Sequence, residues 1–359
     1  MGRRSQILKH VRKQQRGIEI GPWFDPLAPK HEGYDVLVLD VFGTAELLRR
    51  AEADPAIPKE KLACIESVDL IGSAHDIADT VATQAPPLGS FDYVISSHNF
   101  EHVPNPIHFL QGCQQVLRPG GMLSFAVPDR RVSFDYFNPH SITADFLEAF
   151  FASRTRPTPK QVFRTHSLHA RFDCSDGSQS RGFLLTDDTQ HVRGMQLLED
   201  AYQAWVDFEN NPDHLYRDTH CWVFTPASLE LILRDLRYLG LMKFDVLEVS
   251  PTRAHEFYVH LRNVAAPQPI PRSEFYELRN RLLHRIHDEA SVNAPSVFAR
   301  PRTIWSTFRL ARVTELLCHV ARSVLSIARR PNGLFSLRWR RDAAALDVRQ
   351  RRSMESCRK

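Results

Sequence analysis

The sequence predicts an α/β protein with a mostly parallel sheet that is covered by helices on both faces. Short apolar runs rich in Val, Leu and Ile alternate with segments of helical character, which requires crossover connections between parallel strands. The first apolar run ends in glycine, as a buried strand does before a tight turn. The predicted strands are residues 17–21, 34–41, 65–71, 91–96, 122–127, 243–249 and 256–261.

Helices are predicted between these strands. Residues 44–53 have helical character, and residues 106–117 form a helix that ends at the turn Arg118-Pro-Gly-Gly121. A third helix covers residues 225–239, because Pro226 suits a first helical turn and Gly240 suits the end. Together with the strands, these helices give the alternation of a wound sheet.

Four regions follow from this pattern. Residues 1–127 form the core of the sheet, and residues 221–263 supply its closing helix and strands. Residues 128–220 interrupt the alternation, and a long segment beyond the carboxyl end of a strand commonly forms a substrate lid. Residues 264–359 form a linker, a charged helix at 273–289 and a helical tail.

The C-terminal tail is strongly basic. Residues 301–359 hold 14 Lys or Arg and 4 Asp or Glu, although the whole chain has a net charge of only +4. The apolar spacing in residues 303–330 predicts an amphipathic helix that either packs on the body or contacts anionic lipid at the inner membrane face. No signal peptide or membrane-spanning run is recognised, and six scattered cysteines suit reduced thiols, so a cytoplasmic protein is expected.

Three residues form a pattern that is typical of nucleotide-like cofactor sites. Gly21 follows the first strand, where the backbone must approach the cofactor closely. Asp40 ends the second strand, where a carboxylate accepts hydrogen bonds from the hydroxyls of a ribose. Asp76 follows the third strand, where an acid can bond to the amino group of adenine.

Three further segments occur in the order and spacing of a known family. They are Phe91-Asp-Tyr-Val-Ile-Ser96, Glu101-His-Val-Pro-Asn-Pro106 and Leu117-Arg-Pro-Gly-Gly-Met122. With Gly21 and Asp40 they resemble the class I S-adenosylmethionine (AdoMet)-dependent methyltransferases, over roughly residues 17–127. Pro128-Asp-Arg-Arg-Val-Ser-Phe-Asp135 adds a resemblance to a bacterial subgroup that is associated with polysaccharide gene clusters.

The resemblance implies a doubly wound, Rossmann-like sheet of seven strands, with AdoMet bound across the carboxyl ends of the strands. Carried over by position, Glu19 and Gly21 would line the methionine part of AdoMet, and Ser97 and His98 would lie near its sulfonium. Asp40 would bind the ribose and Asp76 the adenine. The chain departs from the family at its first loop, where Gly21 is followed by Pro22, Pro26 and Pro29 instead of two further glycines.

Methyl transfer to a hydroxyl needs a proton acceptor, and histidine suits this role because its pKa is near neutral. His98 and His102 follow the fourth strand, and Asp129 follows the fifth, so these three are the candidate catalytic residues. His102 is equally expected to cap a helix or bond to the backbone, and Asp129 to form a structural ion pair with Arg130. His166 and His169 have metal-ligand spacing, but no metal site is predicted.

Three functions remain open from the sequence. The leading one is O-methylation of a saccharide or glycolipid precursor. The second is methylation of RNA or protein, which the basic tail favours; no nucleic-acid-binding module is recognised, and nucleic acid is not expected as a partner. The third is a non-catalytic subunit with a methyltransferase fold, which the missing glycines favour and the retained Asp40 and Asp76 disfavour.

Overall fold

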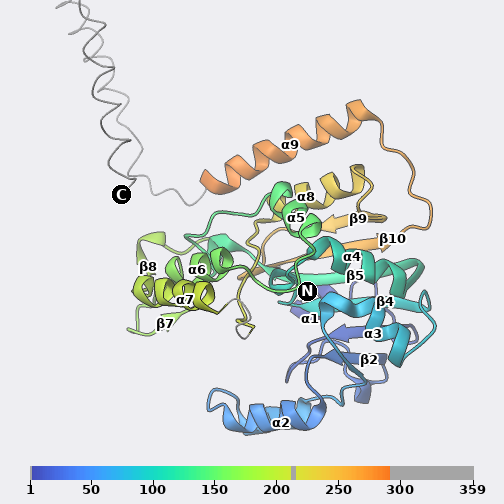
Figure 1. Ribbon diagram of the computed structural model, residues 1–359, viewed down its shortest axis with the longest axis horizontal. Helices are drawn as coiled ribbons and strands as arrows, with labels where there is room; N and C mark the ends of the chain where they lie inside the picture. The colour runs from blue at the N-terminus through green and yellow to red at the C-terminus, as the bar shows by residue number, and fades with distance from the viewer. Residues whose placement is uncertain (1, 212–215, 292–359) are drawn as a thin grey trace, which may run out of the picture. The chain divides into compact units, whose positions relative to one another are not determined.

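The computed structural model describes residues 2–211 and 216–291 (Figure 1). The chain divides into two units, residues 1–295 and 296–359. The second unit lies outside the described residues. The amphipathic helix expected at 303–330 and its expected membrane contact fall in this unit. Within the described residues, no helix is both long enough and apolar enough to cross a bilayer.

A sheet of seven strands forms the centre of the first unit, as predicted. Its order is β3-β2-β1-β4-β5-β10-β9, with parallel pairing from β3 to β5 and antiparallel pairing of β10 with both of its neighbours. This is the doubly wound arrangement that the resemblance implies. The strands are β1 (Arg16–Ile20), β2 (Asp35–Asp40), β3 (Leu70–Ile71), β4 (Phe91–Ser97), β5 (Leu117–Pro128), β9 (Phe244–Val249) and β10 (Glu256–Asn263).

Two strands differ from their predicted bounds by more than two residues. The strand expected over residues 65–71 is only two residues long, because the short helical turn η2 (Lys59–Cys64) and an extended connection occupy the approach to it. β5 starts five residues earlier than predicted and contains the glycine turn. Gly120 has φ +82°, a left-handed conformation that suits glycine, and the β4–β5 register shifts near this turn.

Two of the six helices that accompany this sheet begin with side-chain caps. The Asn105 side chain accepts a hydrogen bond from His108 N at the start of α4, and Thr225 and Ser228 form a capping box on α8. Tyr238 of α8 stacks on Phe275 of α9 at 3.7 Å between ring centroids. These helices are α1 (Arg3–Ile7), α2 (Thr44–Ala53), α3 (Ile77–Gln84), α4 (Pro106–Val116), α8 (Pro226–Tyr238) and α9 (Arg272–Ser291).

The insertion after β5 has more regular structure than its sequence indicates. Its described residues form three helices and a small sheet of order β7-β6-β8. Figure 1 shows α6, α7 and the small sheet grouped together beside the main sheet, whereas α5 lies next to α8. The strands are two to four residues long, too short to give a recognisable period. The elements are α5 (Thr143–Phe151), α6 (Pro159–Ser167), β6 (Ala170–Asp173), β7 (Gln179–Ser180), β8 (Val192–Gly194) and α7 (Leu198–Asn210).

Candidate active site

The predicted cofactor residues meet at the carboxyl edge of the main sheet. Ile20, the last residue of β1, is paired with Leu39 on β2 and with Ser96 on β4. Gly21 therefore lies between Asp40 and Ser97, at the point where the strand order reverses. Open α/β sheets bind their ligands at this switch point.

The loop after β1 is anchored by a carboxylate. Glu19 is only 1 % exposed, and its two oxygens accept hydrogen bonds from Leu27 N at 2.7 Å and Ala28 N at 3.0 Å. Burial raises the pKa of Glu19 to about 7, against the lowering effect of these two bonds. Glu19 thus fixes the loop after β1, which stands where a helix usually follows the first strand. The contact of Glu19 with the methionine part of AdoMet stays a prediction.

The space above the first turn is open. Gly21 has φ +57°, and a Cβ atom built on it would have no atom within 4 Å. Asp40 accepts a hydrogen bond from Phe42 N at 3.0 Å through one oxygen, and burial raises its pKa. Val41 follows β2 and Ile71 ends the neighbouring edge strand β3, and each is 55 % exposed.

These features fit the adenosyl part of AdoMet. A carboxylate beside a glycine turn suits a ribose diol, and exposed apolar side chains next to that carboxylate suit the faces of an adenine ring. Asp40 and Gly21 would hold the cofactor, with Val41 and Ile71 as apolar walls. When bound, AdoMet supplies the electrophilic methyl group.

Asp76 lies after β3 and is about half exposed. Its Oδ1 is 3.7 Å from His75 Nε2 and 3.6 Å from His108 Nε2, and the two imidazole rings lie 4.5 Å apart. The carboxylate therefore lies in the turn that packs on α4, with histidines beside it. A bond from Asp76 to adenine stays a prediction.

His98 follows β4 in a strained conformation. Its φ is +51°, which is unusual for a residue other than glycine and commonly marks a functional position. His98 Nε2 lies 2.7 Å from Glu256 Oε2, and Glu256 also binds the guanidinium of Arg3 and the hydroxyl of Tyr258. Arg3 in turn donates to the hydroxyl of Ser97.

Neighbouring carboxylates raise the pKa of His98. Desolvation lowers it, but the hydrogen bond to Glu256 and the charge of Glu101 together outweigh this effect. Since Glu256 binds Nε2, His98 Nδ1 is the atom left to accept a proton, 3.5 Å from Glu101 Oε1. A strand-end imidazole held by a carboxylate is the arrangement of a general base.

His102 lies in a second polar cluster with residues from the end of the insertion. Its Nδ1 is 2.9 Å from Asp218 Oδ1, and its ring meets that of His220 edge to face at 4.7 Å. Burial lowers the pKa of His102, but the hydrogen bond to Asp218 and the charge of Glu101 outweigh this effect, so the pKa is raised. The expectation of a simple cap or backbone contact is therefore incomplete, because the His102 ring bonds to a side chain far along the sequence.

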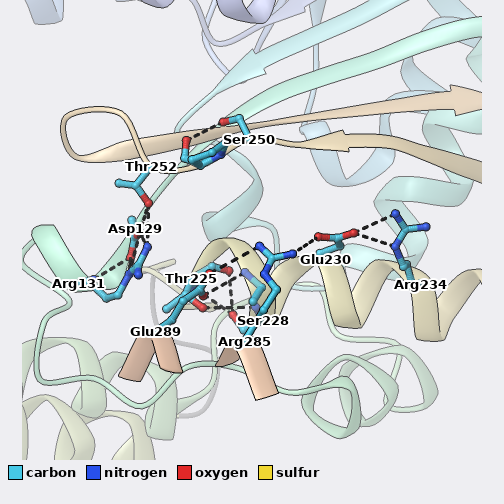
Figure 2. A network of polar contacts seen from close by, with 12 residues as sticks. Asp129, Arg131, Thr225, Ser228, Glu230, Arg234, Ser250, Thr252, Arg285 and Glu289 are labelled. Carbon is cyan, nitrogen blue, oxygen red and sulfur yellow. Dashed lines mark hydrogen bonds and ion pairs between the residues drawn. The ribbon is translucent and has the colours of Figure 1, made fainter. Parts of the chain in front are cut away.

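Asp129 was expected to face the same crevice, and its surroundings argue against a catalytic role. It is fully buried, and both oxygens are bound, by the backbone and guanidinium of Arg131 and by the hydroxyl of Thr252 (Figure 2). The structural ion pair therefore forms, but with Arg131. The expected partner, Arg130, donates instead to the carbonyl of Tyr136 at 2.9 Å.

Other candidates from the sequence have structural places. Trp222 and Phe224, which follow the insertion, are 2 % and 1 % exposed and belong to the core. His169 stacks on Phe134 at 4.7 Å. Among the described residues, His166 and His169 are not part of any cluster with metal-ligand geometry.

Sequence reasoning missed the residues that complete the site from a distance. Arg3 and Glu256 lie 253 positions apart and meet over Ser97. Asp135, inside the motif after β5, lies 2.5 Å from His220 Nδ1. Glu256 begins a predicted strand, and a carboxylate in that apolar run was the one available signal.

The comparisons with known proteins identify the family of the chain. A family described as "Methyltransferase domain" matches residues 6–236. A ubiquinone biosynthesis O-methyltransferase from Albidiferax ferrireducens is 27 % identical over 139 residues, which cover 38 % of this chain and 49 % of the relative. One from Cereibacter sphaeroides is 30 % identical over 114 residues, covering 32 % and 42 %. The matched part thus spans about half the length of these relatives or less.

Solved structures of similar fold include AdoMet-dependent methyltransferases from Mesorhizobium loti and Aquifex aeolicus. The first is 15 % identical, with a TM-score of 0.34, and the match covers 71 % of this chain and 95 % of that one. The second is 13 % identical, with a TM-score of 0.36, and the match covers 73 % and 90 %. The family match extends over well more than half of the sequence. The chain belongs to the methyltransferase-domain family, with AdoMet as the cofactor that this membership implies, as the motifs predicted.

Proposed function

We propose that this protein transfers the methyl group of AdoMet to a hydroxyl oxygen of a small-molecule acceptor, and that the acceptor is a saccharide or glycolipid precursor. The observation that carries the proposal is the position of His98, next to Ser97 at the cofactor edge and held by Glu256. His98 Nδ1 takes the proton from the acceptor hydroxyl as the oxygen attacks the methyl group. Glu256 compensates the charge that then develops on the imidazole.

A pocket beside this imidazole supports a small acceptor. It has a volume of about 280 Å³ and lies between the insertion and the residues that precede β10. Phe172 and Phe183 of the insertion line it, as does His255, whose ring is 6.0 Å from that of His98. This lining supports a role of the insertion as the substrate lid.

The polar side of the site supports a hydroxyl-rich acceptor. Tyr216 is 56 % exposed, and its hydroxyl lies 3.2 Å from Asp218 Oδ1, next to His102. Exposed aromatic rings with a neighbouring carboxylate suit the apolar face and the hydroxyls of a sugar. The curated relatives act in ubiquinone biosynthesis, so a polyprenylated phenol is the competing acceptor.

Cofactor binding is tested by isothermal titration of AdoMet into the intact chain. The Asp40→Asn variant should bind about 10-fold to 100-fold more weakly, because a charge-assisted hydrogen bond is lost. Glu52→Gln, at an exposed position on α2, is the matched control and should not change the affinity. No binding by the intact chain, or equal affinity for Asp40→Asn, would contradict AdoMet binding at this edge.

Transfer is tested with methyl-labelled AdoMet and a panel of saccharides, glycolipid precursors and polyprenylated phenols. The product should resist mild alkali, as a methyl ether does and a methyl ester does not. His98→Asn should lower kcat by about 10²-fold or more while AdoMet affinity is retained, and the exposed His284→Gln serves as control. Label only in phenols would reject the saccharide acceptor, and label in no hydroxyl compound would reject O-methylation.

A further inference from the structure

Glu101 is a buried carboxylate without a hydrogen-bond partner. Its side chain is 0 % exposed, and neither oxygen receives a hydrogen bond from the residues that the structure describes. The imidazole of His98 approaches at 3.5 Å, beyond good hydrogen-bond geometry. An ionised carboxylate out of water needs a compensating cation at close range, since its desolvation costs several kcal/mol.

Two imidazoles surround this carboxylate. One oxygen of Glu101 and one ring nitrogen each of His102 and His220 lie within 4.8 Å of one another. First-row metal ions bind imidazole nitrogen and carboxylate oxygen at about 2.0–2.2 Å. Three ligand atoms at the observed spacing therefore need only small side-chain movements to bind one ion.

Each histidine is oriented by a carboxylate behind it. Asp218 Oδ1 lies 2.9 Å from His102 Nδ1, and Asp135 Oδ2 lies 2.5 Å from His220 Nδ1. Asp135 is itself held by Asn138 at 2.9 Å. These bonds occupy Nδ1 and leave Nε2 of both histidines as the ligand atom. Carboxylates in this position fix the tautomer and the ring orientation of metal-binding histidines.

The backbone holds the three residues together before any ion arrives. Glu101 O accepts hydrogen bonds from Cys221 N at 2.8 Å and Trp222 N at 3.2 Å. The exit loop of β4 is thereby joined to the end of the insertion, next to His220. The ligand set is thus built on two fixed segments that lie far apart in the sequence.

Three other clusters in the described residues have similar spacing and do not share this feature. Glu256 already binds Arg3 and His98. Glu248 pairs with Lys9, and Asp76 is exposed to solvent. Among these carboxylates of the described residues, Glu101 alone is both buried and without a hydrogen bond.

We propose that Glu101, His102 and His220 bind one divalent transition-metal ion of the Zn²⁺ class. Two imidazoles and one carboxylate suit this class, and three protein ligands leave a coordination position open. The bound ion would offer the open position to the acceptor hydroxyl and lower the pKa of that hydroxyl, and His98 would take the proton. This second step rests on the proposed function, whereas metal binding does not.

The binding step is tested by titrating ZnCl₂ into the intact, metal-stripped chain in the presence of a competing chelator. One ion per chain should bind, and His102→Gln and His220→Gln should each weaken its affinity more than 100-fold. Cobalt substitution should give visible absorption bands that both variants lose. The exposed control His284→Gln should leave the affinity and the spectrum unchanged. Zinc that the His102 and His220 variants retain with unchanged affinity would lie at another site.

A milder variant separates metal binding from folding. Asp218 is exposed and contacts His102 from outside, so Asp218→Asn should preserve the circular dichroism spectrum and weaken the ion about 10-fold to 100-fold. The metal site would be overturned if the intact chain bound no zinc. It would also be overturned if the His102, His220 and Asp218 variants bound zinc as tightly as the unchanged chain does. If the chain binds AdoMet but no metal ion, this inference alone is rejected. If it binds a metal ion but no AdoMet, the proposed function alone is rejected.

Discussion

His98 Nε2 lies 2.7 Å from Glu256 Oε2 and so joins the end of a parallel strand to the start of the antiparallel strand β10. Glu256 is paired across the sheet with Pro128 at the end of β5. The antiparallel strand therefore places a buried carboxylate at the edge where the parallel strands end. A strand added in the other direction would begin at the far edge and could not supply this group.

Removing the charge of Glu256 should destabilise the protein. Glu256 is 3 % exposed, its pKa is lowered to about 2 despite burial, and it faces Arg3 and His98. Glu256→Gln leaves the Arg3 guanidinium without its carboxylate partner and weakens the hydrogen bond to His98, and should cost about 2–4 kcal/mol of unfolding free energy in urea titrations. Glu277→Gln, in an exposed pair with Arg281 on α9, should cost less than about 0.5 kcal/mol. Equal costs would show that the Glu256 cluster is no stronger than a surface pair.

Two glycines separate backbone strain from cofactor contact. Gly21 and Gly120 both have positive φ and open space where a Cβ would lie, but only Gly21 is at the proposed AdoMet edge. Alanine at either position should cost about 1 kcal/mol of stability. Only Gly21→Ala should also weaken AdoMet binding, by about tenfold or more in calorimetric titration. A similar loss in Gly120→Ala would place the effect in the fold and not in the site.

Gly17 is required by an aromatic ring on the next strand. A Cβ at this position would lie 2.0 Å from Tyr93 Cε2, and the two residues are paired across β1 and β4. Gly17→Ala should therefore destabilise the protein by about 1–3 kcal/mol or more. A double-mutant cycle with Tyr93→Leu should recover part of this loss, since the clash disappears. Additive losses would show that the backbone, not the ring, resists the substitution.

His260 should make stability depend on pH in mildly acidic solution. Burial lowers its pKa to about 4, helped by nearby His10 and Lys9 and opposed by Glu248. Because the folded pKa lies below the unfolded value near 6.5, this contribution is complete above pH 6.5 and is lost as the pH falls toward 4. The loss should approach about 3 kcal/mol.

The measurement is urea unfolding at several pH values between 7 and 4. His260→Gln keeps a group that can bond to Ser124, which lies 2.9 Å from His260 Nδ1, and should flatten the pH dependence relative to the unchanged chain. Parallel curves for the two proteins would assign the acid sensitivity to other groups.

Local patterns predicted the sheet edge well. Gly21, Asp40 and Ser97 each end or follow an apolar run, and parallel strands bring such ends together, so their proximity follows from the sequence alone. The short strands of the insertion carry no period and were missed. Asp129 was misplaced because its sequence position does not show that Arg131 and Thr252 enclose it. Contacts such as Arg3 with Glu256 depend on the whole fold, and no short-range pattern reveals them.

The insertion is closed at its base by its own ends. Asp129 forms an isolated bridge with Phe224, Arg130 N donates to Phe224 O at 2.9 Å, and Ser141 N donates to Val223 O at 2.8 Å. For a loop closed in this way, doubling the length costs only about 0.6 kcal/mol of closure entropy. Evolution or an engineer can therefore exchange the segment between these bridges for one of different length and composition. On the proposed function, such an exchange would alter acceptor preference and leave the cofactor residues at the sheet edge, Gly21 and Asp40, in place.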